Sequence, residues 1–469
     1  AGLGTALLLE RAGHEVTLLE RDPPPPADPE VAWDTWERRG VPQARLAHVF
    51  MGRMRKMIEE ELPDVWADLL AGGASEITSA TVMPRTIADR SPRPVDAQQR
   101  ILGMRRVVLE RHLRTALDRS PRVTVHSSTA VADVATGAPI DGIPVVTGVV
   151  TEDGRTFDAD LVVDCAGRRS PLPSWVERLA GRTPPEDVTE DGLMYFGRHY
   201  RLEDGQSFPD QSDLGLVADL GYLFSLTFEA DRGHFAIALA VHAADKAIRA
   251  LRDEETFERA LLAMPHTLKW RSPGRSRPVS EVTSMSRIDD RWRDLVVAGR
   301  PLVVGLVAVG DSLVATNPAF GRGSTLAWLM AAALRDAIAG HGDDPVALAR
   351  EYATTIGGEV RGWYDFTAQA DAGRLRVMEA ILHGEPLPQP DPDDVMAAFG
   401  TGFQLASQTD PDAYRALQQV VNMHQLPFDV VADPDIAATA IAAYEARDTA
   451  PTVVAGPTRD ELLAAMGVA

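Results

Sequence analysis

Residues 308–326 constrain the fold of this chain more than any other part of the sequence. They concentrate glycine and proline, in the order AVGDS and then NPAFGRGSTL, between two apolar runs. The run Leu302–Val309 has the length and β-branched content of a buried strand, and Ser324–Ala339 has the alanine and leucine content of a helix. We therefore expect a strand, a tight loop and a helix. Such a unit points free backbone N–H groups and the positive end of the helix dipole at whatever binds in the loop.

The N-terminal residues form a second glycine-containing unit. The chain starts AGLG, continues as an alanine- and leucine-rich helix to Gly13, and then gives the strand Glu15–Glu20. In the dinucleotide-binding fingerprint, G-x-G-x-x-G follows a first strand and an acid at the end of the second strand binds the ribose. Gly2 would be the third glycine and Glu20 the acid, so we expect an N-terminally truncated version of a longer protein. An ordinary helix–strand connection is the alternative interpretation.

Composition excludes several functional classes. The net charge is −21 with a pI near 5.0, which argues against nucleic acid or an anionic membrane as a partner. Cys165 is the only cysteine, so an internal disulfide and a multi-cysteine metal site are excluded, and a reducing cytoplasm is the expected location. No apolar run reaches the roughly 18 residues of a membrane span. Histidine spacing shows no i, i+4 pair on a helix, so we expect no metal site.

The 469 residues exceed the roughly 300 at which single cores stop growing, and we expect an α/β protein with intertwined domains. Residues 1–190 and 289–345 are predicted to form a three-layer, Rossmann-like domain. Between 191 and 288 the pattern changes to alternating strands, which predicts an inserted antiparallel sheet with one solvated face. Residues 346–469 are predicted to be helical, with a linker at Pro386–Pro392.

Shorter elements are predicted between these landmarks. Residues 47–62 read as a helix stopped by Pro63, and Arg106–Leu117 has the apolar spacing of another helix. A strand is expected over Val123–Val131. The Asp-Gly turn at Gly154 predicts a hairpin of 145–151 with 155–159, and 161–164 returns as a buried strand before a glycine turn.

Four stretches, in this order and spacing, resemble one family. They are AGLG with Glu20 and Arg21, the RVVLE that starts at Arg106, the DCAGRRS that starts at Asp164, and the loop 310–323. Over residues 1 to about 345 they resemble the FAD-dependent monooxygenases of the para-hydroxybenzoate hydroxylase type, and more closely their branch of flavin halogenases and related oxidoreductases. The resemblance implies a Rossmann-like FAD-binding domain, with the inserted sheet supplying the substrate pocket.

The resemblance also implies the FAD contacts. Gly2 would approach the pyrophosphate, Glu20 the adenosine ribose, and Arg106 the FAD from its helix, while Val131 would offer backbone to the adenine. Asp311 would bind the flavin-side ribose or ribityl chain. The remaining residues assigned to FAD are Arg21, Asp164 and Gly167 in their motifs, and Pro318, Gly321, Arg322 and Gly323 beside the isoalloxazine. Glycines there let the backbone approach a flat ring, although a simple strand–helix turn is the alternative.

One departure from the family pattern concerns how the flavin would be reduced. The second fingerprint usually has an Asp immediately before its glycine, where this chain has Ala166 and a displaced Asp164. The reductant is therefore expected to be NAD(P)H, either used directly or through a separate flavin reductase. The Trp-x-Trp-x-Ile-Pro segment of halogenases is absent from the sequence, and Lys56 lies in a charged segment, so halogenation is the lesser hypothesis.

The expected activity is oxygen insertion, as a hydroxylase or epoxidase, through a flavin hydroperoxide and on a small organic substrate such as a secondary metabolite. The catalytic candidates are Arg45, which would face the cofactor, and His48, which would orient substrate or donate a proton. Both could instead cap or pack a helix. Tyr195 is expected to be an ordinary sheet residue, with pocket lining as the alternative. The alternative functions are a flavin-dependent reductase of the geranylgeranyl-reductase type and a flavin-binding pseudoenzyme.

Overall fold

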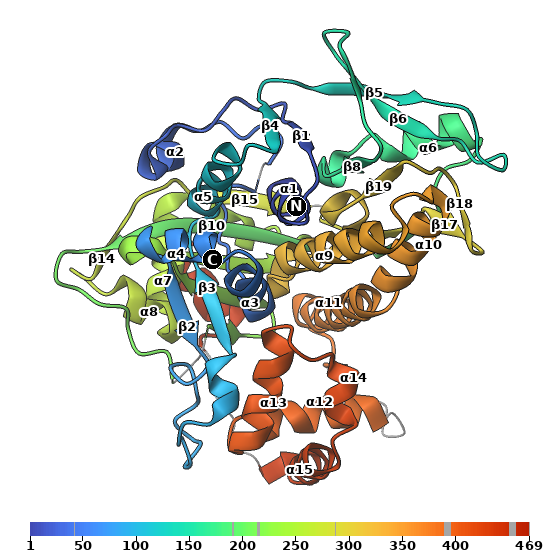
Figure 1. Cartoon of the computed structure of the whole chain (residues 1–469). Helices are drawn as coiled ribbons and strands as arrows, with labels where there is room; N and C mark the ends of the chain where they lie inside the picture. The colour runs from blue at the N-terminus through green and yellow to red at the C-terminus, as the bar shows by residue number, and fades with distance from the viewer. Residues whose placement is uncertain are drawn as a thin grey trace.

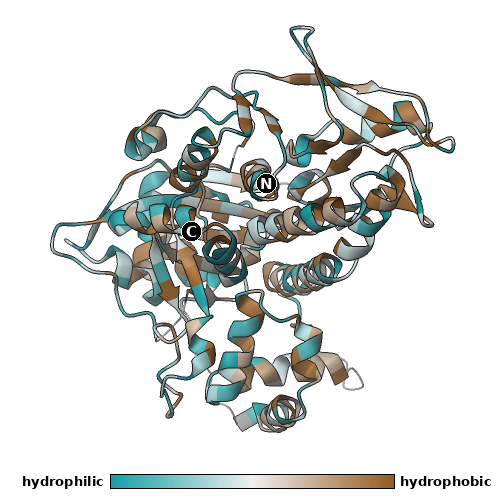
Figure 2. Cartoon of the chain, viewed as in Figure 1, coloured by the Kyte–Doolittle hydropathy of each residue, from teal (hydrophilic) through white to brown (hydrophobic). Residues whose placement is uncertain are grey.

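The structure is a computed structural model that describes residues 1–41, 43–189, 192–212, 216–286, 288–388, 395–449 and 456–468 (Figure 1). The predicted linker Pro386–Pro392 lies partly outside these residues. Helices surround and cross several small sheets, and a larger antiparallel sheet lies behind them. In Figure 2 hydrophobic residues follow the strands and inner helix faces, and hydrophilic residues follow the outer loops. No helix of the described ranges is both long enough and apolar enough to cross a membrane.

Two parallel strand pairs form the α/β part of the molecule. Strand β1 (Val16–Leu19) pairs with β4 (Val123–His126), and β8 (Val162–Asp164) pairs with β19 (Leu306–Ala308). In Figure 1 the two pairs lie on either side of helix α1 (Gly2–Arg11). The carboxyl ends of parallel strands are where α/β folds bind ligands.

Helix α1 packs against two long helices, α5 (Arg106–Asp118) and α9 (Gly323–His341). Its interior is apolar, with Leu7 and Leu8 fully buried. Gly4 permits the contact with α9, because a Cβ there would lie 2.8 Å from the indole ring of Trp328. Close packing at this position therefore requires glycine, and it brings the N-termini of α1 and α9 to one region.

The middle sheet has the strand order β11-β12-β13-β10-β14, with β15 also paired to β10. These strands are β10 (Leu193–Leu202), β11 (Val217–Asp219), β12 (Leu223–Glu229), β13 (His234–His242), β14 (Ser276–Pro278) and β15 (Thr283–Ser286). All of these pairings are antiparallel, as predicted.

The prediction of one solvated face on this sheet is wrong. Helices α7 (Glu254–Ala263) and α8 (Pro265–Arg271) cover one face, where Phe235 and Trp270 are buried. The opposite face carries Tyr195 and Leu226, which pack with residues of helix α11 (Glu359–His383). Strand β13 is therefore buried over almost its whole length.

Three predicted elements differ from the structure because of non-local backbone pairing or left-handed turns. Helix α3 spans only Gly52–Glu61, because Phe50 pairs in an extended bridge with Leu102; Pro63 then begins α4 (Pro63–Ala71). The run 302–309 is interrupted at Gly305, whose φ is +73° and where a Cβ would lie 2.1 Å from the carbonyl oxygen of Val146. The run 123–131 is divided by a turn into β4 and β5 (Val131–Thr136).

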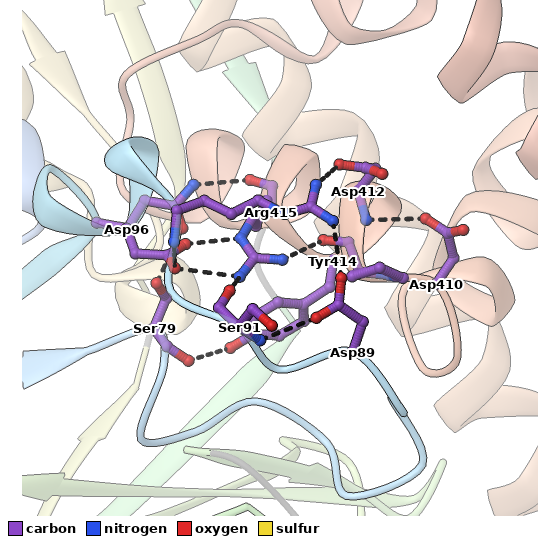
Figure 3. Close-up of polar contacts among 11 residues, drawn as sticks. Ser79, Asp89, Ser91, Asp96, Asp410, Asp412, Tyr414 and Arg415 are labelled. Carbon is purple, nitrogen blue, oxygen red and sulfur yellow. Dashed lines mark hydrogen bonds and ion pairs between the residues drawn. The ribbon is translucent and has the colours of Figure 1, made fainter.

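The C-terminal part is helical, and its helices between residues 395 and 445 lie at the bottom of Figure 1. It comprises α10 (Pro345–Ile356), α11, and then α12 (Val395–Ala406), α13 (Pro411–Val421), α14 (Pro427–Val431) and α15 (Pro434–Glu445). Figure 3 shows how α13 meets the long loop that joins β2 (Ser75–Thr78) to β3 (Arg100–Gly103). The guanidinium of Arg415 binds both carboxylate oxygens of Asp96 at 2.7 and 3.1 Å.

Candidate active site

A cavity of about 1750 Å³ lies between the ends of the parallel strands, the α1 and α9 N-termini and the middle sheet. Pockets for single drug-sized ligands have volumes of roughly 300–1,000 Å³, so this one has room for a dinucleotide and a second molecule. All of the predicted cofactor contacts except Arg322 line it, namely Gly2, Glu20, Arg21, Arg106, Val131, Asp164, Gly167, Asp311, Pro318, Gly321 and Gly323.

Two helix N-termini open into this cavity. Residues Ala1 to Thr5 at the start of α1 line it, as do Gly323 and Ser324 at the start of α9. Within the described part of the chain, no side chain caps either helix. The first N–H groups of a helix are unsatisfied and carry partial positive charge, so both ends favour anionic or electron-rich groups.

Glycine turns shape the cavity wall next to these helices. Gly167, Gly310 and Gly321 have φ values of +80°, +71° and +65°, in the left-handed region that favours glycine. Each follows or joins a strand, and all three line the cavity. Beside the α9 terminus, the buried hydroxyl of Thr316 has no hydrogen-bond partner among the described residues. A backbone cradle with an unsatisfied hydroxyl fits a flat ring with polar edges.

The carboxylate of Asp164 joins two of these turns. It accepts hydrogen bonds from the Ala166 N–H at 2.8 Å and from the hydroxyls of Ser312, at 3.2 Å, and Ser170. The Ser312 hydroxyl in turn accepts from the Gly167 N–H at 2.8 Å. Burial raises the pKa of Asp164. Its oxygens therefore organise the protein backbone, whatever contact the rest of the residue makes with a cofactor.

A chain of charged side chains runs along the cavity wall from Glu20 to His48. Arg38 lies 3.4 Å from Glu20 and 3.3 Å from Glu110, and its guanidinium stacks on Trp36 at 4.4 Å. Glu110 also pairs with Arg106 at 2.8 Å. Arg38 and Glu110 were not among the predicted site residues; the i, i+4 spacing of Arg106 and Glu110 on one helix was the only signal in the sequence.

His48 is the last side chain in this series of contacts, and it lines the cavity. Its Nδ1 lies 2.9 Å from the carbonyl oxygen of Leu46, so Nδ1 must carry the proton and donate it. Nε2 then accepts from Arg106 at 3.2 Å. Burial and the nearby Arg106 guanidinium lower the pKa of His48 to about 3. The imidazole is therefore neutral at physiological pH and has no proton to donate at Nε2.

Two other predicted site residues lie outside the cavity. Arg45 donates to the carbonyl oxygens of Trp33, at 3.0 Å, and Trp36, at 3.2 Å. Arg322 is buried against Phe320 and three other partners: Trp363, Phe366 and the hydroxyl of Thr367. Both arginines hold backbone or helices in place around the site.

In the described part of the chain we find neither a reactive thiol nor a group of carboxylates that could hold a metal ion. Burial raises the pKa of the Cys165 thiol to about 11, which keeps it protonated and unreactive at neutral pH. Within the described ranges, no three His, Cys, Asp or Glu side chains gather as they would around a metal ion.

The middle sheet supplies the other half of the cavity. Its apolar lining there consists of Leu226, Phe228, Ala238, Met285 and Ile288. Tyr195 lies among them with 4% of its surface exposed, and its hydroxyl binds Asn317. Strand alternation alone could not show whether Tyr195 or Phe196 faces this side. Asn317 was missed because nothing in its local sequence indicates a contact with β10.

Comparison with solved structures shows the fold. PqsL, a probable FAD-dependent monooxygenase from Pseudomonas aeruginosa, aligns with a TM-score of 0.55 and 16% identity over 81% of this chain and 94% of its own. CmlS, a flavin-dependent halogenase, gives 0.57 and 17% over 92% and 76%. The tetrameric 2-methyl-3-hydroxypyridine-5-carboxylic acid oxygenase gives 0.52 and 14% over 80% and 90%.

Among curated proteins, Protein Rv3254 of Mycobacterium tuberculosis is 26% identical over 363 residues, which are 72% of this chain and 71% of that protein. No protein-family model matches the sequence. The chain has the fold of FAD-dependent monooxygenases and flavin-dependent halogenases. The predicted fold class, an α/β FAD-binding fold with an inserted antiparallel sheet and a helical C-terminus, is confirmed.

Proposed function

We propose that this protein is an FAD-dependent monooxygenase that hydroxylates or epoxidises a small organic substrate. The observation that carries the proposal is the opening of two uncapped helix N-termini, those of α1 and α9, into one cavity large enough for a dinucleotide and a second molecule. The α1 end suits a pyrophosphate, and the α9 end suits the electron-rich edge of a reduced flavin.

Bound and reduced FAD would supply the activation of O₂, from which one oxygen atom passes to substrate and the other leaves as water. The protein residues would position the reactants. Arg168 braces the loop at the α9 end, since it donates to the carbonyl oxygens of Asp289 and Thr316 at 2.6 and 2.7 Å and lies 3.5 Å from Asp311. The apolar sheet wall would exclude water from the reacting atoms.

His48 and Arg106 act as a positioning pair in this proposal. Arg106 would contact FAD while its Nη1 holds His48 in the neutral form that donates to the Leu46 carbonyl. This fixes the segment 46–50, which forms part of the cavity wall. His48 therefore does not act as a proton donor in the proposed reaction. The reductant would be NAD(P)H, directly or through a separate reductase; the second route is supported by the commitment of the Asp164 carboxylate to protein groups.

The test is to record the visible flavin absorption of the purified protein, add NADH or NADPH without oxygen, and then follow oxygen uptake with candidate substrates. We expect the flavin absorption to bleach and oxygen uptake then to depend on the substrate. If NADH and NADPH alone do not bleach the flavin, a flavin reductase is added to supply the electrons. Bleaching with no oxygen uptake would instead indicate the reductase alternative. A protein that binds no FAD when the cofactor is added would contradict the proposal.

A matched pair of variants assigns the binding to the cavity. Asp311→Asn removes a carboxylate that lines it, whereas Asp336→Asn removes an exposed one on α9 that pairs with Arg335. We expect FAD affinity to fall about tenfold or more in the first variant, because a charge-assisted hydrogen bond contributes roughly 1.5–3 kcal/mol. The second variant should bind FAD like the unmodified protein.

A further inference from the structure

Arg322 is a buried cation at the N-terminus of α9. It is the residue directly before the helix, and only 4% of its surface is exposed. Its guanidinium lies 4.4, 4.7 and 5.2 Å from the ring centroids of Phe320, Phe366 and Trp363. Its Nη1 donates to the Thr367 hydroxyl at 2.9 Å. Among the described residues, no carboxylate forms an ion pair with it.

The side chain of Arg322 keeps its positive charge at neutral pH. Burial lowers its pKa to about 9, while the charge of Asp371 favours the protonated form. The three aromatic rings attract the cation through their faces, but they carry no net charge. The positive field of the guanidinium is therefore only partly offset by the protein around it.

This position is unfavourable for a cation in the protein alone. A buried charge without an ion-pair partner is costly because it has lost its water. The N-terminus of a helix also carries partial positive charge, which repels a second cation. An anionic group beside this helix end would be attracted by both charges. Gly321 and Gly323, on either side of Arg322, line the cavity, so such a group would lie in the cavity next to this loop.

We infer that Arg322 stabilises the reduced form of FAD by its charge, without touching the cofactor, and so raises the midpoint reduction potential of the bound flavin. The inference rests on the proposed function for the position of the ring beside α9. Reduction by NAD(P)H transfers a hydride, which is two electrons and one proton, and leaves NAD(P)⁺. The neutral ring thereby gains one negative charge. A fixed cation nearby lowers the free energy of the reduced form and leaves that of the oxidised form almost unchanged.

The orientation of the side chain suits an effect of charge and not of contact. Arg322 does not line the cavity, and its guanidinium packs on Trp363 and Phe366 of helix α11. An arginine that held the ring by hydrogen bonds would line the cavity instead. The aromatic side chains keep water away from the guanidinium, and water would otherwise screen its charge.

A matched pair of variants at Thr367 tests the charge without removing the arginine. Thr367 is fully buried. Thr367→Asp places a carboxylate where the hydroxyl now accepts from Arg322, and so neutralises the guanidinium. Thr367→Asn offers a neutral acceptor of similar size.

The midpoint potential of bound FAD is measured by reduction with dithionite, without oxygen, against a dye of known potential. We expect Thr367→Asp to lower the preference for reduced over oxidised FAD about tenfold, which is roughly 30 mV for a two-electron couple. Thr367→Asn should leave the potential unchanged. Arg322→Met, which removes the charge outright, should lower the potential at least as far as Thr367→Asp.

Arg374→Met is the control for packing around the loop. Arg374 lies 5.5 Å from the centroid of the same Phe320 ring, but it pairs with Asp219 at 3.5 Å. Because its charge is compensated, we expect this variant to keep the potential of the unmodified protein.

An unchanged potential in Thr367→Asp, or an equal fall in Thr367→Asn or Arg374→Met, would overturn the inference, since the charge of Arg322 would then not set the potential. A protein that takes up no FAD would overturn it together with the proposed function. If the potentials follow the expected pattern but no substrate raises oxygen uptake, the proposed monooxygenase activity is contradicted and the role of Arg322 is not.

Discussion

Two histidines donate to a single carbonyl oxygen next to the cavity. The oxygen of Leu46 lies 2.9 Å from Nδ1 of His48 and 3.2 Å from Nε2 of His199. Burial lowers the pKa of His48 to about 3 and that of His199 to about 4, from an ordinary value of 6.5. Each imidazole must stay neutral because a second proton would bring charge into a buried, partly cationic environment.

We expect acid to destabilise the protein through this pair. Above pH 6.5 both imidazoles are neutral in either state, and the free energy of unfolding has its full value. Below pH 6.5 the unfolded chain binds protons that the folded chain does not, so the free energy of unfolding falls as the pH decreases toward 4. The variant His199→Gln keeps a donor for Leu46 but cannot titrate. By urea unfolding, its stability should fall less than that of the unmodified protein between pH 6.5 and 4.5, by about 2 kcal/mol. Parallel pH curves for the two proteins would contradict this assignment.

Asp290 gives the opposite pH dependence. It is 1% exposed, and burial raises its pKa to about 6. A carboxyl whose pKa is higher in the folded state supports folding below about pH 4, and that support is lost as the pH rises through 6. Asp290→Asn keeps the acceptor for the Asn317 N–H. We expect this variant to be more stable than the unmodified protein by about 3 kcal/mol at pH 8 and by less than about 1 kcal/mol at pH 4, as measured by urea unfolding; a difference that is the same at both pH values would exclude the raised pKa as its cause.

At the level of elements, α9 offers two glycines with opposite requirements. Gly321 precedes the helix at φ +65°, where a Cβ would lie 2.6 Å from Met51 and 3.1 Å from Val49. Gly340 lies in the last turn, with no described atom within 4 Å of an added Cβ. Gly321→Ala should destabilise the protein by about 1–2 kcal/mol and weaken FAD binding, because the left-handed conformation disfavours a side chain. Gly340→Ala should stabilise it by about 0.5–1 kcal/mol and leave FAD binding unchanged.

Thermal unfolding and FAD titration of both variants check this prediction. If Gly321→Ala retained normal stability and FAD affinity, the backbone before α9 would not have the described conformation. If Gly340→Ala lost FAD, the effect of Gly321→Ala could not be assigned to its position beside the cavity.

The elements around the site were predictable where short-range signals determine them. The helix after the glycine loop was expected over Ser324–Ala339 and spans Gly323–His341, because propensity and the absence of breakers act locally. The start of α3 was not predictable, since Phe50 is held extended by a bridge to Leu102, far away in the sequence. Gly305 likewise interrupts a strand-like run because of the distant Val146.

The site shows the same division. Gly2, Asp164 and Asp311 stand in motifs whose spacing carries information, and all three line the cavity; their contacts with FAD stay a prediction. The contacts Tyr195–Asn317 and Arg38–Glu110 join segments far apart in the chain, and no local pattern marks them. Resemblance can suggest that a residue is near a cofactor, but only the fold shows that the His48 imidazole already has both nitrogens occupied.

At the scale of the whole molecule, helix α13 contacts the α/β part through polar groups of the loop between β2 and β3 (Figure 3). Besides its two bonds to Asp96, Arg415 donates to the Ser91 carbonyl at 2.8 Å. The Tyr414 hydroxyl donates to the Ser79 carbonyl at 2.6 Å. Only 4% of the Arg415 surface is exposed, so this arginine is the buried centre of the contact, and none of these residues lines the cavity.

Arg415→Met should therefore loosen the attachment of α13 without changing the cavity. Removal of the arginine from this buried ion pair leaves the Asp96 carboxylate without its cation, and we expect the free energy of unfolding to fall by about 2–4 kcal/mol. Hydrogen exchange should rise in the 79–99 loop and in α12–α15, while FAD binding stays unchanged. The control is Arg447→Met, because Arg447 is an exposed arginine of the same helical region that stacks on Tyr444; it should leave exchange unaltered. Faster exchange around the α1 and α9 N-termini in Arg415→Met would mean instead that the C-terminal helices support the cofactor cavity directly.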